Sequence, residues 1–139
     1  MDTGRSLQDA RAAAGPPPDL HWPADDTHIP DWIYTDRRVY DLEQERIFLG
    51  RHWNFVGLEC EVPEPGDYIR SFVGAIPVVV TKDENGAFHV FENRCAHRGV
   101  EFCREYRGNT ERFVCPYHNW TYDLGGALVA VPFRRGVKD

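Results

Sequence analysis

From residue 53 onward, short apolar runs alternate with polar and glycine-rich stretches, and this pattern predicts a β-rich domain. The runs are rich in β-branched and aromatic residues, which favour extended backbone. The Asn85-Gly86 step predicts a hairpin turn, and Gly125-Gly126 predicts a turn between the last two strands. We predict strands at 53–58, 68–73, 77–82, 87–91, 112–115, 120–123 and 127–131.

Residues 34–50 carry a helical pattern instead. Their apolar positions form an uneven stripe with the spacing of one helix face. Thr35 or Asp36 can cap the start of this helix, and Gly50 stands where a glycine commonly ends one. We therefore predict one short helix that precedes the strands.

The N-terminal residues are predicted to form an extended arm. Prolines at 16–18, 23 and 30 exclude a continuous helix and favour extended chain. Such an arm is either partly disordered or wraps a partner subunit, and in the second case Trp22 and Trp32 would anchor it.

The patterns together predict three regions: an arm at 1–30, a helix region at 31–52 and an all-β domain at 53–139. A chain of 139 residues is long enough for one domain with a core of its own. Its content of 42% hydrophobic and 13% aromatic residues is typical of a globular protein.

Charge and hydropathy exclude several classes of function. The net charge of −6 and the pI near 5.5 argue against a nucleic-acid partner, which requires clustered Lys and Arg. No apolar run approaches the roughly 18 residues of a membrane span, so no membrane partner is expected. The N-terminus lacks the apolar core of a secretory signal, which predicts a cytoplasmic protein. In that reducing compartment, cysteines are expected as ligands or buried thiols, and Cys60 and Cys103 are predicted to be buried or semi-buried.

Two short stretches hold the candidate chemistry, and each contains one cysteine followed by one histidine. Cys95 and His97 form a C-x-H motif, and after 17 residues Cys115 and His118 form a C-x-x-H motif. Zinc accepts two Cys and two His, but its usual sites group the cysteines in one knuckle and the histidines in another. Pairing one Cys with one His in each loop suits a two-iron centre. In a Rieske [2Fe–2S] cluster both thiolates bind one iron and both imidazoles bind the other.

The stretches "CAHRG" and "CPYHNWTYDLGG" resemble the Rieske motif of aromatic-ring-hydroxylating oxygenases, in their large (α) subunit. The segments "ERIFLGRHWNFVGLE" and "VPFRRGVKD" also resemble that family, so the likeness runs from about residue 30 to the end. "EFCRE" and "VPFRRGVKD" are similar to the branch that acts on salicylate or anthranilate. The resemblance implies an all-β Rieske fold whose [2Fe–2S] cofactor is bound by Cys95, His97, Cys115 and His118.

The resemblance also implies partners and a reaction. In this family a ferredoxin, or a flavin/iron–sulfur reductase, supplies electrons to the cluster. His118 would face an aspartate of a neighbouring α subunit, which leads to a mononuclear Fe(II) that activates O₂. The product would be a hydroxylated aromatic acid of the benzoate type. Neighbouring α subunits, and in some members a β subunit, complete the assembly.

The loops further predict a low reduction potential. High-potential Rieske proteins carry an additional cysteine in each loop and a serine after the second histidine. Here Tyr117 and Asn119-Trp120 stand at the places expected in the second loop, and Cys103 lies too far from Cys95 to match the first. With fewer hydrogen bonds to sulfur, we expect a potential of roughly −150 mV. Trp120 and Tyr122 are predicted to cover the second loop.

The catalytic iron of this family sits on a 2-His-1-carboxylate triad in a larger C-terminal domain. No such triad is predicted within these residues, so the chain is expected to be a C-terminally truncated fragment that carries electrons and has no catalytic residues of its own. The alternatives are a stand-alone Rieske ferredoxin and a structural zinc module.

Overall fold

The computed structural model describes residues 21–23 and 27–133. Its contacts divide the chain into two compact units, one up to Trp53 and the other from Asn54, and each is described by itself. Most of the predicted arm lies outside the described residues. Within the first unit, Trp22 packs edge to face on Trp32, with ring centroids 6.1 Å apart.

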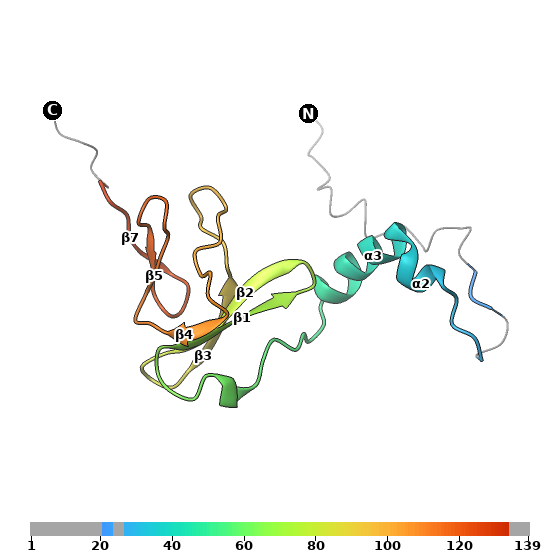
Figure 1. Ribbon diagram of the computed structural model, residues 1–139, viewed down its shortest axis with the longest axis horizontal. Coiled ribbons are helices and arrows are strands. Elements are labelled where there is room, and N and C mark those ends of the chain that lie inside the picture. Colours follow the sequence, from blue (N-terminus) through green and yellow to red (C-terminus); the bar gives the residue numbers. More distant parts are fainter. Residues whose placement is uncertain (1–20, 24–26, 134–139) are drawn as a thin grey trace, which may run out of the picture. The chain divides into compact units, whose positions relative to one another are not determined.

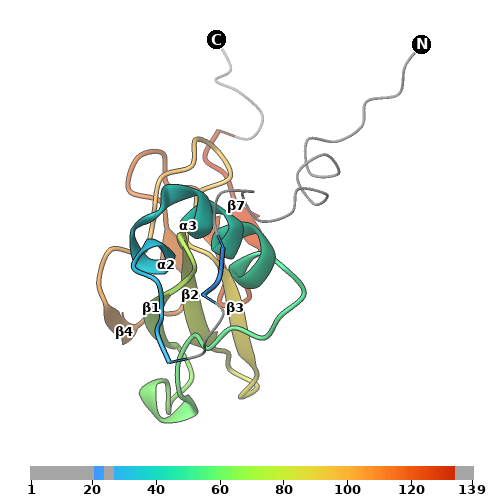
Figure 2. The ribbon, with the colours of Figure 1, turned by 90° about the vertical axis from the view of Figure 1, so that its right-hand side faces the viewer.

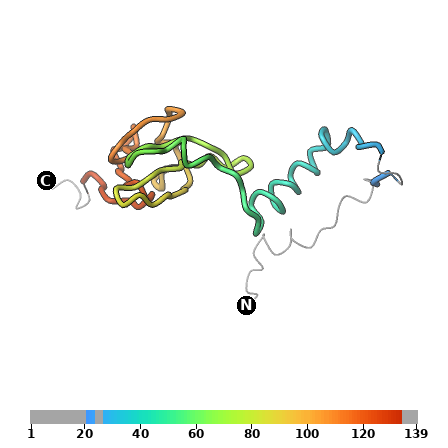
Figure 3. The backbone as a smooth tube through the Cα atoms, turned by 90° about the horizontal axis from the view of Figure 1, so that it is seen from below, coloured from blue at the N-terminus to red at the C-terminus, as the bar shows by residue number. Residues whose placement is uncertain are grey.

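The first unit contains the helical turns, which follow one another in Figure 3. They are α2 (Trp32–Thr35), α3 (Arg37–Glu43) and a π-helical turn (Gln44–Phe48). The predicted single helix is therefore interrupted, because the backbone of Asp36 is extended at φ −83° and ψ 121°. Asp36 nevertheless caps α3, as its carboxylate accepts a hydrogen bond from the Arg38 N–H at 2.8 Å.

Gly50 marks the end of the helical region, as predicted. A Cβ atom at this position would collide with the backbone carbonyl of Arg46, so a residue with a side chain would force the backbone to shift. None of the described helices is long and apolar enough to cross a membrane.

The second unit holds two antiparallel sheets, which confirms the predicted all-β Rieske fold class (Figures 1 and 2). The larger sheet has the order β3-β2-β1-β4, and the smaller has the order β5-β6-β7. The strands are β1 (Asp67–Val73), β2 (Ile76–Lys82), β3 (Phe88–Glu92), β4 (Arg107–Asn109), β5 (Phe113–Val114), β6 (Thr121–Tyr122) and β7 (Leu128–Ala130).

One predicted strand is absent from the described residues, and one strand was not predicted. Residues 53–58 join neither sheet, and Trp53 and Phe55 are exposed. Aromatic residues favour a strand only where a neighbouring strand can form backbone hydrogen bonds with it, and none of the described strands lies beside these residues. Val56 packs against the core through its side chain. Strand β4 was missed because Arg107-Gly108-Asn109 carries no apolar residue. It forms because β1 offers a free edge, on which Tyr68 pairs with Gly108.

The larger sheet buries residues on both faces. On one face, Ile69 and Val80 pack against Val62, which follows a 3-10 turn (Glu59–Glu61). On the opposite face, Val79 belongs to a larger cluster that includes the smaller sheet and both cysteines of the Cys–His motifs. Because alternate residues of a strand face opposite sides, the neighbours Val79 and Val80 supply different cores.

Two hairpins close with the same turn. Asp83 Oδ1 accepts hydrogen bonds from the N–H groups of Asn85 and Ala87, at 2.9 and 2.8 Å. Asp123 Oδ1 does the same for Gly125 and Ala127, at 3.0 and 2.8 Å. The predicted turns at Asn-Gly and Gly-Gly are both confirmed. Each ends on a glycine with positive φ, +80° at position 86 and +82° at position 126.

The second of these turns fastens the smaller sheet to the larger one. Thr81 Oγ1, on β2, donates a 2.6 Å hydrogen bond to the Leu124 carbonyl. Gly126 lies so close to Phe91 that a Cβ atom would be 2.6 Å from the ring. A residue with a side chain at 126 would therefore separate the two sheets.

The first Cys–His loop follows β3 and is closed by two backbone hydrogen bonds. The Cys95 N–H donates to the Val100 carbonyl at 2.8 Å, and the Cys95 carbonyl accepts from the Gly99 N–H at 2.8 Å. Gly99 has a φ of +75°, which lets the chain turn back.

The second loop, between β5 and β6, repeats this closure. The Cys115 N–H donates to the Trp120 carbonyl at 2.8 Å, and the Cys115 carbonyl accepts from the Asn119 N–H at 2.9 Å. Asn119 takes the place of the glycine, with a φ of +56°. Asparagine tolerates this left-handed conformation better than most residues with a side chain.

The left-handed backbone conformation of Asn119 can be tested by substitution. Asn119→Gly should leave the free energy of unfolding unchanged or slightly higher, whereas Asn119→Val should lower it by about 1–2 kcal/mol, because β-branched residues are strained there. Urea unfolding measures both. Asn85→Val, at a turn position with negative φ, is the control, and an equal loss at both sites would contradict the interpretation.

The lowered pKa of Asp83 predicts how the stability of the chain depends on pH. A hydrogen bond with His89 Nε2 at 2.8 Å, followed by the backbone N–H groups of the turn, holds this pKa below its ordinary value of 3.8. A depressed folded-state pKa contributes stability above pH 4 that is lost as pH falls through the folded value. The stability difference between wild type and Asp83→Asn, which keeps the acceptor for the turn, should therefore shrink below pH 4 in urea titrations. A difference that is constant with pH would contradict this.

Candidate functional site

The structure brings together the four residues predicted as ligands. The Cys95 loop follows the larger sheet and the Cys115 loop belongs to the smaller one, and the two loops lie side by side (Figure 1). His97 Nδ1 lies 3.2 Å from His118 Nδ1. The two imidazole rings meet edge to face, with centroids 4.5 Å apart. The matching closure of the loops explains this meeting, because it presents one histidine from each side.

The two cysteines lie at the buried end of the site and the two histidines at its outer end. Cys95 and Cys115 are each 1% exposed and belong to the same buried cluster. His97 is half-buried and His118 is exposed. Among the residues that the structure describes, no three His, Cys, Asp or Glu side chains are grouped as for one metal ion. The donors are thus sorted by element, sulfur with sulfur and nitrogen with nitrogen.

Tyr122 is a site residue whose role the sequence did not reveal. Its hydroxyl donates a 3.3 Å hydrogen bond to Cys95 Sγ and accepts one of 2.9 Å from the Ala96 N–H. Burial, followed by the bond with Cys95, raises the pKa of Tyr122 to about 12, so the phenol remains a donor. The strand pattern predicts that Tyr122 is packed, but Cys95 lies 27 residues away and no local signal connects them.

The environment of Cys95 favours its thiolate. Burial alone would raise the pKa of this thiol. The hydrogen bond from Tyr122 and that from the His97 N–H outweigh burial and hold the pKa below its ordinary value. The groups packed around the Cys95 sulfur therefore stabilise its negative charge although the sulfur is buried.

An aromatic ring lies against each imidazole. Trp120 stacks on His97, with centroids 4.9 Å apart and planes at 18°. Tyr117 lies against His118 at 6.3 Å and 29°. Trp120 was predicted to cover its own loop, but its ring covers the histidine of the other one. Desolvation, followed by the nearby charges of His118 and Arg98, lowers the pKa of His97.

An aromatic cluster supports both loops from below. Phe102 stacks on Tyr122 at 4.8 Å and 15°, and it also contacts Phe91 and Phe113. Phe102 was not singled out from the sequence, because it lies in the irregular segment after the first loop. Its ring connects that segment to β6.

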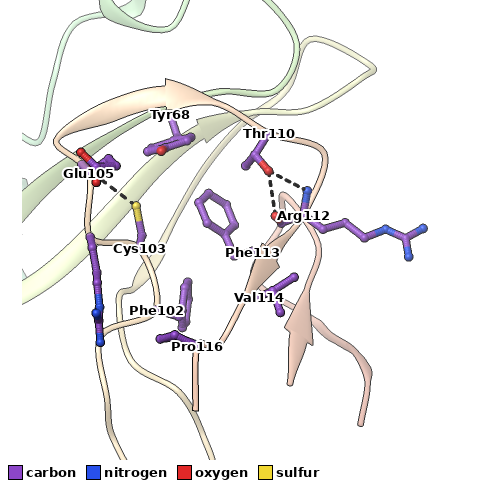
Figure 4. Close-up of a pocket in the computed structure, with 10 residues that line it drawn as sticks. Tyr68, Phe102, Cys103, Glu105, Thr110, Arg112, Phe113, Val114 and Pro116 are labelled. Atoms are coloured by element: carbon purple, nitrogen blue, oxygen red, sulfur yellow. Dashed lines mark hydrogen bonds between the residues drawn. The ribbon is translucent and has the colours of Figure 1, made fainter. Parts of the chain in front are cut away.

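The remaining cysteines differ from each other. Cys60 is exposed in the 3-10 turn, so the prediction that it is buried or semi-buried was wrong. Cys103 is buried as predicted, and burial raises its pKa to about 11. It lines a pocket with Tyr68, Phe102 and Phe113, where its Sγ contacts the Glu105 carbonyl at 3.7 Å (Figure 4). Burial thus favours the neutral thiol of Cys103, which lies outside both Cys–His loops.

Residues 52–139 match the family described as the Rieske [2Fe–2S] domain. The cofactor of this family is the [2Fe–2S] cluster that the paired Cys–His motifs predict.

Two curated relatives cover most of the chain. The large oxygenase component of salicylate 5-hydroxylase from Ralstonia sp. is 50% identical over 88% of this chain. The large subunit of anthranilate 1,2-dioxygenase from Burkholderia cepacia is 53% identical over 86% of it. The matched part is 29% of the length of each relative.

Among solved structures, naphthalene 1,2-dioxygenase from Rhodococcus sp., bound to indole, superposes with a TM-score of 0.69 at 45% identity. The match covers 75% of this chain and 23% of that one. These relatives confirm the resemblance to oxygenase large subunits that "CAHRG" and "CPYHNW" indicate. The family match, the two sheets and the four converging side chains agree: the chain belongs to the Rieske [2Fe–2S] domain family.

Proposed function

We propose that this chain is the electron-transfer domain of an aromatic-ring-hydroxylating oxygenase α subunit, and that Cys95, His97, Cys115 and His118 hold its [2Fe–2S] cluster. The observation that carries the proposal is the sorting of the donors. Two thiols meet at the buried end and two imidazole Nδ1 atoms face each other at 3.2 Å at the outer end. A Rieske centre requires this division, because one iron takes both thiolates and the other takes both imidazoles.

The remaining residues fit such a cluster. When bound, the cluster supplies one-electron redox chemistry. Tyr122 and the His97 N–H stabilise negative charge on Cys95. Trp120 and the aromatic cluster below keep water from the buried thiols, while His118 stays exposed to a partner. The domain therefore has a protected sulfur end and an accessible imidazole end.

The accessible end suggests the route of the electron. With Nδ1 turned toward His97, the Nε2 of His118 lies on the opposite side of its ring, where a carboxylate can accept its proton in a hydrogen bond. In the proposed assembly that carboxylate belongs to a neighbouring α subunit and leads to a mononuclear iron on a 2-His-1-carboxylate triad. A ferredoxin or a flavin/iron–sulfur reductase would supply the electrons, and a β subunit is a further candidate partner.

We further propose a benzoate-type aromatic acid as the substrate of the whole oxygenase. The support is the relatives at 50% and 53% identity, whose names specify salicylate and anthranilate. This chain spans 29% of those relatives, so the substrate assignment is to be tested on the full oxygenase by comparing oxygen uptake with substituted benzoates and with unsubstituted arenes.

Cluster loading tests the ligand assignment. Reconstituted under anaerobic conditions, the chain should bind two irons, give the rhombic low-g EPR signal of a Rieske centre on reduction, and titrate at roughly −150 mV. Cys95→Ser or Cys115→Ser should abolish the signal, whereas Cys60→Ser, at an exposed cysteine, should leave it intact. A colourless, zinc-loaded protein would overturn the proposal.

The hydroxyl of Tyr122 generates a separate test. Tyr122→Phe should lower the potential by roughly 40–60 mV, because a hydrogen bond to the sulfur stabilises the reduced, more negative cluster by about 1 kcal/mol more than the oxidised one. Tyr117→Phe is the matched control, since the ring of Tyr117 is exposed and packs on an imidazole. Equal potentials for both variants and wild type would contradict the role of the bond.

A further inference from the structure

The two Cys–His loops share a closure but differ at their bases. The second loop stands on a backbone ladder, in which Phe113 pairs with Tyr122 and Val114 with Thr121. The first loop has no such ladder. Strand β3 ends at Glu92, and the returning segment 101–104 belongs to neither sheet. Something else must hold the base of the first loop.

The side chain of Asn93 occupies the position where a ladder would be. Its Nδ2 donates to the Cys103 carbonyl at 2.7 Å, and its Oδ1 accepts from the Cys103 N–H at 3.0 Å. A pair of strands exchanges hydrogen bonds in the same way, with one donor and one acceptor on each side. The Asn93 N–H also donates to the Pro77 carbonyl at 2.8 Å, which ties the base of the loop to the sheet.

We propose that Asn93 is a positioning residue that fixes the Cys95 loop for cluster binding; this inference rests on the proposed function. Asn93 is 0% exposed and stands two residues before Cys95, and its bond partner closes the other end of the loop. Without the amide, the Cys103 N–H and carbonyl lose their partners in a buried site. The base of the loop then opens, and Cys95 and His97 are no longer held against Cys115 and His118.

A matched control exists in the same core. Thr81 is the other polar residue with 0% exposure in the part of the chain that the structure describes. Its hydroxyl also bonds a backbone carbonyl, that of Leu124, but this bond fastens the turn between β6 and β7. Thr81→Val thus removes one buried hydrogen bond, where Asn93→Ala removes two, and it leaves the hydrogen bonds at both loop bases in place.

The first measurement is amide hydrogen exchange on the full chain. Asn93→Ala should speed exchange of the Cys95 and Gly99 amides by roughly ten- to a hundredfold relative to those of Cys115 and Asn119. Asn93→Ser, which keeps a short polar group in the buried site, should give a smaller change in the same direction and serves if the alanine variant fails to fold. In Thr81→Val the amide exchange rates of both loops should change by the same factor.

The second measurement is made on the loaded chain. Both Asn93 variants should release iron to a chelator at least about tenfold faster than Thr81→Val, and their reduced EPR g-values should shift while those of Thr81→Val stay at wild type. Iron release and g-values equal to those of Thr81→Val would overturn the inference. If wild type takes up no two-iron cluster, the proposed function fails, and the exchange ratio alone then decides whether Asn93 fixes the loop.

Discussion

The stack of Phe102 on Tyr122 is the contact on which the site depends. Phe102 follows the first Cys–His loop and Tyr122 follows the second, so their rings, 4.8 Å apart, join the two segments that present the donors. The stack also places the hydroxyl of Tyr122 under Cys95 Sγ. Hydrophobic packing and the electrostatics of a sulfur atom are therefore set by the same pair of side chains.

A second constraint is that the site has one end buried in the hydrophobic core and one end exposed to solvent. The thiols are part of the hydrophobic core, whereas His118 is exposed. A charged centre in the core would be costly unless hydrogen bonds met the sulfurs, and the bonds from Tyr122 and the His97 N–H meet this need at Cys95. At the outer end, the exposed imidazole allows contact with a partner without opening the core to water.

The sequence predicted what is encoded locally. Residue type and spacing identified all four converging side chains, and turn chemistry identified both hairpins closed by Asp83 and Asp123. The failures concern partners distant in sequence. Residues 53–58 have the composition of a strand, but none of the described strands lies beside them. Strand β4 lacks the composition of a strand, yet it forms because β1 lies beside it. The roles of Tyr122 and Asn93 arise only when residues 27 and 10 positions away fold against them.

The shared closure of the two loops limits how such a domain can evolve. Each loop is a ring of fixed size, from the cysteine to the residue whose carbonyl accepts its N–H, with a left-handed residue just before the end. The histidine is the second residue after Cys95 but the third after Cys115. An insertion or deletion of one residue would break the ring or rotate the imidazole away from its counterpart, whereas most substitutions inside the ring would not. Geometry therefore constrains the number of residues between cysteine and histidine in each loop more strongly than it constrains their identity.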